Sequence, residues 1–357
     1  MRALTRQPLL RAPLLRALFG TPGNAVISLL MLGAFALALP PLFRWMIGDA
    51  VWEAPNRAAC LAAGSGACWA FIRARFALFF YGLYPEPERW RVEIGLLLLV
   101  VVGTGALFAR RGRFWWLLTL LTALPVTCGV LLAGGVFGLK PVPTPQWGGL
   151  MLNVVISFVA LGGAIPLGIA LAFGRRSRYP VIRILSVVMI EFWRGVPLLT
   201  VLFMGLILLP LFLPHGVTVD NLVRALVVMT LFTGAYMAET IRGGLQGVPN
   251  GQAEAATALG MHHAQVQLLI VLPQALRLSI PGIINIAVEL FKDTTLVSIV
   301  GLFDLMGVVN QSMKDPAWLG LAAEGYTFAA IMFFFACLII SLGGSLLERR
   351  FGVGQRR

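Results

Sequence analysis

Three charged residues, Glu289, Lys292 and Asp293, lie within one apolar run at residues 279–300. Charged side chains inside a membrane-spanning segment are costly, and each is by default a candidate functional group. On a helix, residues three or four apart share a face, so the two acids can meet the base. Such a group in a low dielectric could bind a zwitterion such as an amino acid. A purely structural network of charges is the alternative, and the sequence favours neither.

The segment EAATALGMHHAQVQLLIVLP, residues 254–273, is more polar than the apolar runs on either side. Its alanines favour a helix with small side chains, and Gly260 can adopt the positive φ that ends a helix. A second helix is expected to continue as far as Pro273, with an apolar stripe against the ends of the spans. The stripe consists of Val266, Leu269 and Ile270. Two short helices with a bend could act as a lever for a partner protein, or form a surface helix with no partner.

The composition indicates the environment in which these residues lie. Of 357 residues, 59% are hydrophobic and 12% are charged, whereas soluble proteins average about 45–50% and about 25%. The chain is therefore predicted to be an integral membrane protein. Its long apolar runs favour helices over the short alternating strands of a membrane barrel. We expect an all-α, polytopic fold.

Eight apolar runs are candidate spans. They lie at residues 24–43, 92–109, 114–137, 148–173, 197–213, 222–241, 279–300 and 326–347. The first run follows several arginines and has no small-residue cleavage signature. We therefore expect it to be an uncleaved span rather than a signal peptide.

Basic residues in short loops predict the orientation, because cationic side chains resist translocation. With the N-terminus in the cytoplasm, the basic loops at 110–113 and 175–183, the segment at 254–273 and the tail all fall on the cytoplasmic side. Both termini are therefore expected to be cytoplasmic. The net charge of +13 then reflects topology and attraction to anionic lipid headgroups. Nucleic-acid binding would require a soluble basic face, and the sequence indicates none.

A long outside loop separates the first two spans. Its stretch CWAFIRARFALFFYG, residues 68–82, contains Arg73 and Arg75, and each would cost about 2.5–3.5 kcal/mol within a span. An interfacial helix is the better interpretation. Cys60 and Cys68 lie in the same loop. In an oxidising compartment they could form a disulfide, or they could remain free thiols.

A Pro-rich stretch at residues 140–147 breaks helices and marks the predicted domain boundary. Residues 1–147 are expected to form an accessory region with three spans and the long loop. Residues 148–348 hold nearly every motif and intramembrane charge and are expected to form the working domain. Residues 349–357 form a basic tail.

The spacing of Glu-Ala-Ala, Gly260, Ile270 and Leu272-Pro273 resembles the EAA loop of the permease subunits of bacterial ATP-binding-cassette importers. The flanking stretches EFWRGVPLLTVLF, GAYMAETIRGGLQGVPNGQ, LPQALR and FKDTTLVSIVG resemble the polar amino-acid branch of these permeases. This resemblance covers about residues 148–348. The extra N-terminal spans and the loop with YPEPERWR resemble the larger permease of the broad-specificity L-amino-acid importer.

The resemblance implies a multi-pass permease of the bacterial inner membrane, whose five-helix core forms half of a path for L-amino acids. It implies that the EAA loop couples the chain to an ATPase through Glu254, Ala255, Ala256, Gly260, Ile270, Leu272 and Pro273. The implied partners are a cytoplasmic ATPase dimer that binds ATP and Mg²⁺, a different sister permease, a periplasmic amino-acid-binding protein and membrane lipid. Thr294 follows the charged group in the matching FKDTT stretch, and joins Glu289, Lys292 and Asp293 as a candidate of the substrate pathway.

The chain itself lacks a phosphate-binding loop, because each of its three lysines follows a large apolar residue rather than a glycine. We therefore expect no catalysis and no cofactor bound by this chain. His262 and His263 are adjacent, point to different helix faces and have no neighbouring ligand cluster, so no metal site is expected. Two charged pairs are expected to be structural, Glu191 with Arg194 and Glu239 with Arg242.

Three other classes of protein are alternatives. An ion-coupled secondary transporter fits the composition and the buried charges as well as an ATP-driven importer does. A channel needs polar residues at repeated depths, and only the run at 279–300 carries a cluster. An intramembrane hydrolase needs histidine within the spans, and the three histidines fall in loops. Dependence of transport on ATP or on an ion gradient separates the ATP-driven importer from the secondary transporter.

Overall fold

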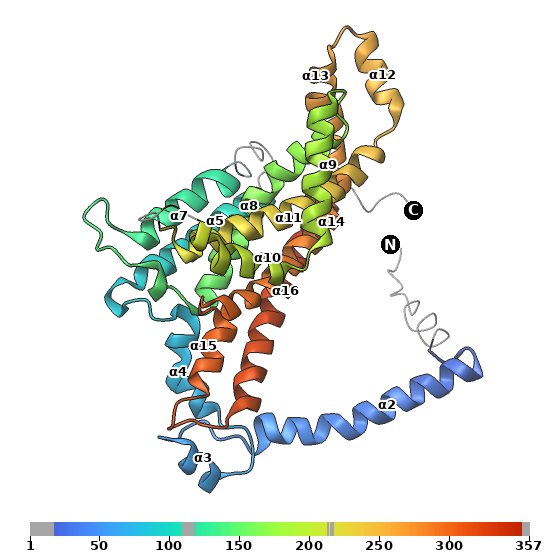
Figure 1. Ribbon diagram of the computed structural model, residues 1–357. Helices are drawn as coiled ribbons and strands as arrows, with labels where there is room; N and C mark the ends of the chain where they lie inside the picture. Colours follow the sequence, from blue (N-terminus) through green and yellow to red (C-terminus); the bar gives the residue numbers. More distant parts are fainter. Residues whose placement is uncertain (1–17, 109–115, 117–118, 213, 215–217, 352–357) are drawn as a thin grey trace, which may run out of the picture. The chain divides into compact units, whose positions relative to one another are not determined.

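The computed structural model describes residues 18–108, 116, 119–212, 214 and 218–351. Over these residues it consists of helices joined by turns, with no named strand, which confirms the predicted all-α class (Figure 1). Two compact units are present, Met1–Ala74 with Asp315–Glu324, and Arg75–Lys314 with Gly325–Arg357. The arginines predicted to orient the chain at 2–16, 110–113 and 356–357 lie outside the described residues, as does His215.

Within the described part of the chain, six helical segments are long and apolar enough to cross a membrane. They are Pro22–Gly48, Glu86–Phe108, Gly149–Arg175, Asn221–Gln246, His263–Val300 and Ala322–Phe351. A seventh is added if the bent pair Pro180–Gly195 and Leu198–Phe212 counts as one span. The predicted number of eight is not confirmed. In the described part of the run at 114–137, a π-helical turn at Thr119–Ala123 leads into the short apolar helix Leu124–Ala133, and most of the run's residues before that turn lie outside the described chain.

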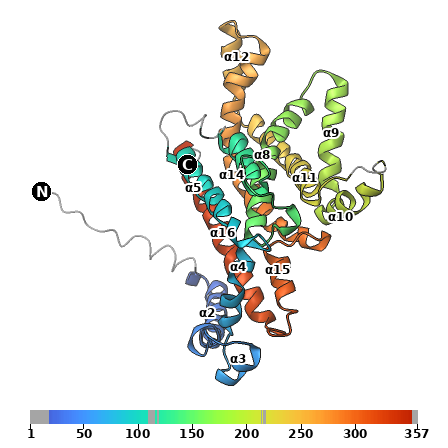
Figure 2. The same ribbon diagram turned by 90° about the vertical axis from the view of Figure 1, so that its left-hand side faces the viewer.

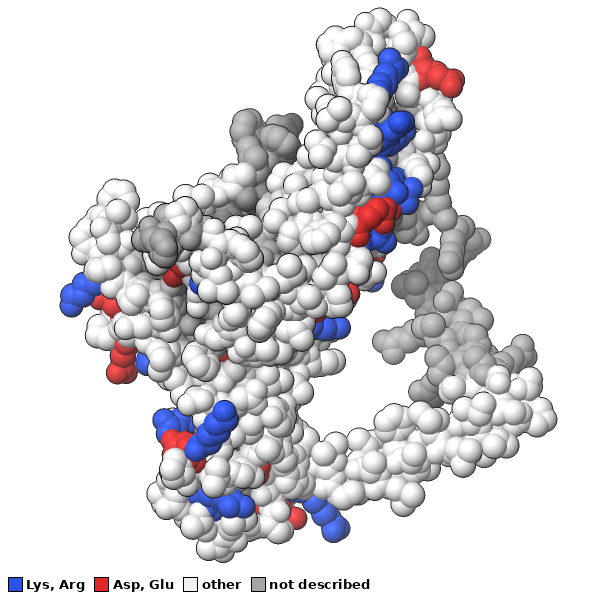
Figure 3. Space-filling view, viewed as in Figure 1, with Lys and Arg blue, Asp and Glu red and all other residues white. Residues whose placement is uncertain are grey.

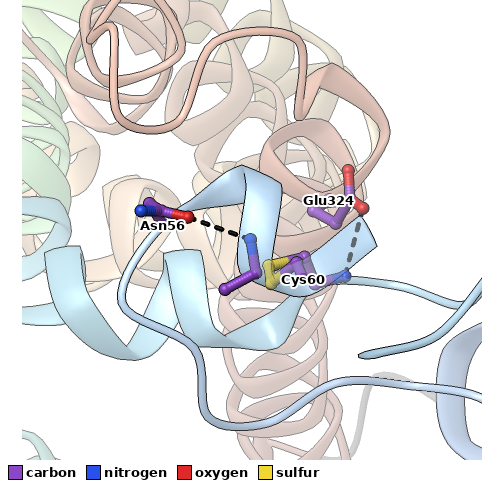
Figure 4. Close-up of a disulfide and its surroundings, with 5 residues drawn as sticks. Asn56, Cys60 and Glu324 are labelled. Atoms are coloured by element: carbon purple, nitrogen blue, oxygen red, sulfur yellow. Dashed lines mark hydrogen bonds between the residues drawn. A yellow bond between two sulfur atoms is a disulfide. The ribbon is translucent and has the colours of Figure 1, made fainter. Parts of the chain in front are cut away.

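The first unit contains α2 (Pro22–Phe43), a π-turn at Arg44–Gly48, α3 (Arg57–Ala63) and the start of α4 (Trp69–Tyr81). A disulfide joins Cys60 to Cys68, whose Cα atoms lie 5.9 Å apart (Figure 4). The backbone N–H of Cys68 donates to Oε1 of Glu324 at 3.1 Å. The N–H of Arg57 donates to the carbonyl of Ala317 at 2.9 Å. These two bonds join α3 and the residue before α4 to residues 315–324, which include the start of α16.

Removing this disulfide is expected to loosen the first unit. The two cysteines are eight residues apart, and closing so short a loop stabilises the folded state by about 2–3 kcal/mol. Cys60→Ser combined with Cys68→Ser should therefore speed hydrogen exchange between residues 49 and 67, and reductant should do the same to the wild type. Cys128→Ser removes a free thiol in the second unit and serves as the control. Unchanged exchange in the double variant would contradict this role.

α4 confirms the helix predicted over residues 68–82, and its 13 residues are too few to cross a bilayer. The second half of α4 packs in the second unit, where the Phe76 and Phe79 rings lie 6.4 and 5.3 Å from the ring of Phe328. Its place at the membrane interface remains a prediction.

The second unit begins with α5 (Trp90–Phe108), a π-turn at Thr119–Ala123 and α7 (Leu124–Ala133). The core follows with α8 (Gly149–Arg175), α9 (Pro180–Gly195), α10 (Leu198–Phe203) and α11 (Asn221–Gln246). It continues with α12 (Asn250–Ala258), α13 (His263–Gln265), a π-turn at Val266–Val271, α14 (Leu272–Asp293), a 3₁₀ helix at Thr294–Val300, α15 (Leu305–Ser312) and α16 (Ala322–Phe351).

α11 lies at the centre of the core and packs on both α8 and α14. Small residues allow this close approach. An added Cβ at Gly168 would lie 2.7 Å from the side chain of Met237, and one at Gly234 would lie 2.6 Å from Leu167. Both distances are too short for real carbon contacts, so these positions fix the spacing of α8 and α11.

The Pro-rich stretch that was predicted to mark the domain boundary contains a 3₁₀ turn at Thr144–Gln146. Trp147 at its end is buried in the core, and its indole N–H donates to the carbonyl of Val142 at 3.2 Å. α5 and α7 belong to the same compact unit as the core. The two compact units therefore do not divide at residue 147, and the domain boundary there stays a prediction.

One helix was not predicted. Residues 180–195 lie between the predicted spans at 148–173 and 197–213 and were not assigned to a helix, but they form α9. Arg183, Glu191 and Arg194 interrupt the apolar run, so a search for continuous apolar stretches overlooks it. Its apolar residues nevertheless recur every three or four positions, as in an amphipathic helix.

Candidate functional site

Residues 250–271, here named the EAA arm, project beyond the ends of α8 and α11 (Figures 1 and 2). α12 forms the first half of the arm and ends at Gly260, whose φ is +85°. The N–H of Met261 donates to the carbonyl of Ala256 at 3.2 Å, and that of Gly260 to Thr257 at 2.9 Å. This is a Schellman ending, which requires a left-handed residue and therefore favours glycine. The predicted bend is confirmed.

The second half of the arm starts with a capping box. Nδ1 of His262 accepts from the N–H of Gln265 at 3.4 Å, and the Gln265 side chain accepts from the N–H of His262 at 3.1 Å. His262 therefore begins a helix and turns the chain back toward the core.

The prediction that this second helix is short and ends near Pro273 is wrong. The helix runs from His263 through Pro273 to Val300, a length of 38 residues. A π-turn precedes the proline, and the N–H of Leu272 bonds to the carbonyl of Gln267, five residues back. The wider turn eases the clash between a proline ring and the carbonyl four residues earlier, and proline has no N–H to satisfy. The arm is thus a short helix folded onto the end of a long one.

The arm has a buried face and an exposed face. Ala256 packs with Val266 and Val271 in one apolar cluster, which half-buried Ile270 also contacts. Glu254, Ala255 and Gly260 are exposed, together with Pro273, while Leu272 is half-buried. Among the seven predicted coupling residues, Ala256 and Ile270 therefore hold the arm together. The others remain available to a partner to differing degrees.

Three exposed leucines complete the outer face of the arm. Leu259, beside the bend, is 84% exposed, and Leu268 and Leu269 are more than half exposed. Leu269 was predicted to lie against the spans, which is wrong, because Val266 and Ile270 occupy that side. Leu259 was not predicted at all. An exposed apolar residue at the tip of a projecting arm is suited to a protein contact.

A network of charges joins α8, α9 and α11 near the base of the arm. Glu239 accepts from Arg242 at 2.8 and 3.0 Å and from Arg175 at 2.9 Å, and Arg194 lies 3.9 Å away. Arg175 also donates to Glu191 at 2.8 Å. Within the described residues, the ion pairs of Glu191 and Arg194 are thus with Arg175 and Glu239, not with each other. The predicted Glu191–Arg194 pair is wrong, whereas the Glu239–Arg242 pair is confirmed.

A second polar network lies inside the core, where α8 meets the end of α14. Asn153 is fully buried, and its Nδ2 donates to Thr294 at 2.7 Å and to Asp304 at 3.1 Å. Its Oδ1 accepts from the N–H of Leu305 at 2.9 Å. Burial raises the pKa of Asp304 to about 6, against the hydrogen bonds from Gly307 and Asn153, which lower it. Sequence reasoning missed Asn153, although a lone Asn in an apolar run was the available signal.

Glu289 and Asp293 border two hollows. An open hollow of about 660 Å³ lies between α14 and α16 and is lined by Glu289, Lys292 and Asp293 with Asn285 and Ser341. A smaller one of about 80 Å³ lies between α11 and α14, where Glu289 and Asp293 face Thr233 and Tyr236. The three charged residues predicted for a pathway therefore line one space.

The four candidate pathway residues do not all share this space. Thr294 is fully buried and lines neither hollow. Its hydroxyl accepts a hydrogen bond from Asn153 and donates one to the carbonyl of Phe291 at 2.7 Å. Lys292 forms no ion pair within 4.0 Å with either acid among the described residues. Its ammonium and the two carboxylates are available to a ligand in the open hollow.

Residues 164–353 match the family described as binding-protein-dependent transport system inner membrane component. The chain is 47% identical over 342 residues to the inner membrane amino-acid ABC transporter permease protein YhdY of Escherichia coli (strain K12), covering 95% of this chain and 92% of that protein. It is 36% identical over 398 residues to the glutamate/glutamine/aspartate/asparagine transport system permease protein BztC of Rhodobacter capsulatus, covering 93% and 92%.

Among solved structures, a crystal structure of an amino acid ABC transporter with histidines is similar. It is 29% identical, with a TM-score of 0.50, and the match covers 56% of this chain and 91% of that chain. The two sequence relatives match nearly the whole chain, whereas the solved structure matches little more than half of it.

Proposed function

The chain belongs to the family of binding-protein-dependent transport system inner membrane components and is a permease of the amino-acid ATP-binding-cassette importers, and we propose that it forms half of a path for L-amino acids. A sister permease, different from this chain, would supply the other half. A periplasmic binding protein would deliver the substrate, and a cytoplasmic ATPase dimer would bind ATP and Mg²⁺. Family membership favours this function over an ion-coupled secondary transporter.

The observation that carries the proposal is the continuous helix that joins the EAA arm to the charged hollow. His263 to Val300 is one helical segment, and Glu289 lies about 40 Å along it from the bend at a rise of about 1.5 Å per residue. A force applied to the exposed face of the arm would therefore reach Glu289 and Asp293 through packed backbone. Gly260 keeps the two halves of the arm at a fixed angle, which suits a lever.

The open hollow between α14 and α16 supports a path shared between two chains. It has five polar lining residues, Asn285, Glu289, Lys292, Asp293 and Ser341, on an otherwise apolar wall. A second permease laid against this side would close it. An L-amino acid would place its ammonium near Glu289 and Asp293 and its carboxylate near Lys292.

We further propose that both termini and the EAA arm are cytoplasmic. The Cys60–Cys68 disulfide supports this orientation, since disulfides persist in the oxidising periplasm and not in the cytoplasm. Among the described residues, one candidate membrane crossing, Pro22–Gly48, precedes the disulfide, which would put the N-terminus inside. Arg349 and Arg350 at the end of α16 fit the same topology.

The function is tested by reconstitution. The chain should be purified with its associated subunits, identified by mass spectrometry and placed in liposomes with a periplasmic binding protein. Uptake of labelled L-amino acids should require ATP inside the orientation-selected vesicles and should be insensitive to ionophores. Uptake by this chain alone, driven by an ion gradient, would overturn the proposal.

Replacing the two acids with their amides tests the pathway. Glu289→Gln combined with Asp293→Asn keeps shape but removes two negative charges from the hollow. Transport is expected to fall by about tenfold or more, as for the loss of one charged contact worth about 1.5–3 kcal/mol, with assembly nearly unchanged. Uptake and subunit recovery are measured on the same samples. Equal losses of transport and assembly would instead mean that the acids are structural.

A further inference from the structure

A third hollow, of about 420 Å³, lies away from the charged hollow, between the α8–α9 turn and the EAA arm. Its polar lining comes from two segments. The turn contributes Arg176, Ser177, Arg178 and Tyr179, and the arm contributes His263 and Gln267. Figure 3 shows basic groups gathered along the end of the second unit that carries α9 and the arm.

The positive charge of this hollow is not neutralised within the described chain. Arg175, one residue earlier, is bound to Glu191 and Glu239. Arg176 and Arg178 form no ion pair with any described residue, and no acid lines the hollow. Two guanidinium groups near hydroxyl and amide donors suit an anion with several oxygens, and a phosphate group fits that chemistry.

The surface next to the hollow is apolar and exposed. Residues at the start of α9 are between 48% and 71% exposed, namely Tyr179, Val181, Ile182, Ile184, Leu185 and Val188. Because α9 begins at Pro180, two residues after Arg178, the apolar face starts where the cationic hollow ends. A phospholipid has the same order of parts, with a phosphate followed by acyl chains. A free anion or an acidic protein loop would leave the apolar face uncovered.

We propose that this hollow binds the phosphate of an anionic phospholipid whose acyl chains lie along α9. The headgroup contacts Arg176 and Arg178 on the turn and His263 and Gln267 on the arm, so a bound lipid bridges two segments that are otherwise separated by the hollow. The site thereby gives the EAA arm a contact with the membrane. It goes beyond the proposed transport function and does not depend on it.

The test is lipid retention by the purified complex, measured by native mass spectrometry. Phosphatidylglycerol should be retained in preference to phosphatidylcholine. Arg176→Gln combined with Arg178→Gln should reduce its retention about fivefold or more, and the corresponding double lysine variant should restore most of it. Arg349→Gln combined with Arg350→Gln removes the same charge from the end of α16 and should change retention less than twofold.

Several outcomes would overturn the proposal. Equal losses in both double variants would show general attraction between positive charge and anionic lipid. Displacement of the lipid by millimolar inorganic phosphate would show a phosphate site without lipid specificity. Crosslinking of Leu185→Cys to a second permease chain, with no lipid retained, would show that protein covers α9. Full retention by the Arg176→Gln, Arg178→Gln variant would place the lipid elsewhere.

Discussion

Replacing Gly260 with leucine is expected to abolish most ATP-driven transport while leaving membrane insertion and helix content intact. Gly260 has a φ of +85°, and a Cβ built there meets no atom within 4 Å. The cost therefore comes from the backbone alone, at about 1–2 kcal/mol for a left-handed residue with a side chain. That cost lowers the ratio of bent to unbent arms by a factor of about 5–30, and transport in proteoliposomes should fall with the fraction of bent arms.

A matched pair of alanine variants isolates the backbone effect. Gly251 also has open space around a built Cβ, but it lies within α12 and its φ is not positive. Gly260→Ala should therefore reduce coupling between ATP hydrolysis and uptake, whereas Gly251→Ala should leave it near the wild-type value. Normal uptake by Gly260→Leu, in a complex that still holds its ATPase, would show that the bend is not a lever.

Glu239→Gln is expected to be the most destabilising single substitution at the base of the arm. The Glu239 carboxylate is 16% exposed and is the shared partner of Arg175, Arg194 and Arg242. Removing its charge leaves three guanidinium groups facing a neutral amide. Breaking a buried pair costs about 3–5 kcal/mol, and partial solvent access reduces this to about 2–3 kcal/mol.

The measurement is the apparent Tm of the purified complex in detergent, followed by size-exclusion chromatography. Glu191→Gln is the control, because Glu191 shares the partner Arg175 but is 54% exposed. It should cost under about 1 kcal/mol, as exposed ion pairs usually do. Similar Tm values for the two variants would mean that the three arginines do not depend on Glu239. The charge network around Glu239 would then contribute no more to the stability of the α8, α9 and α11 packing than an exposed ion pair does.

Some features of the arm could be predicted from sequence because they depend on neighbouring residues. Gly260 after an alanine-rich stretch specifies a helix ending, and the structure has one there. The end of the second helix could not be predicted in the same way. Pro273 normally stops a helix, but a π-turn just before it accommodates the ring. In the π-helical segment, Val266 and Val271 pack in an apolar cluster with residues of α8 and α11, and the local sequence does not encode these contacts.

Charge partners were the least predictable part of the site. Spacing within a helix identified Glu239 with Arg242 and placed Glu289 and Asp293 on one hollow. The same rule paired Glu191 with Arg194, whereas Glu191 bonds to Arg175 of another helix. Asn153 and Asp304 are 151 residues apart and meet only when α8 packs against the end of α14.

The sequence by itself determined the membrane environment, the all-α class, the long helices and the bend at Gly260, because each depends on composition or on residues within a few positions. Only the tertiary structure decided which face of the arm is exposed, which arginines are neutralised and which charges border a common space. These properties arise where helices distant in sequence pack together. Burial and ion pairing are set at those contacts, and no single segment contains them.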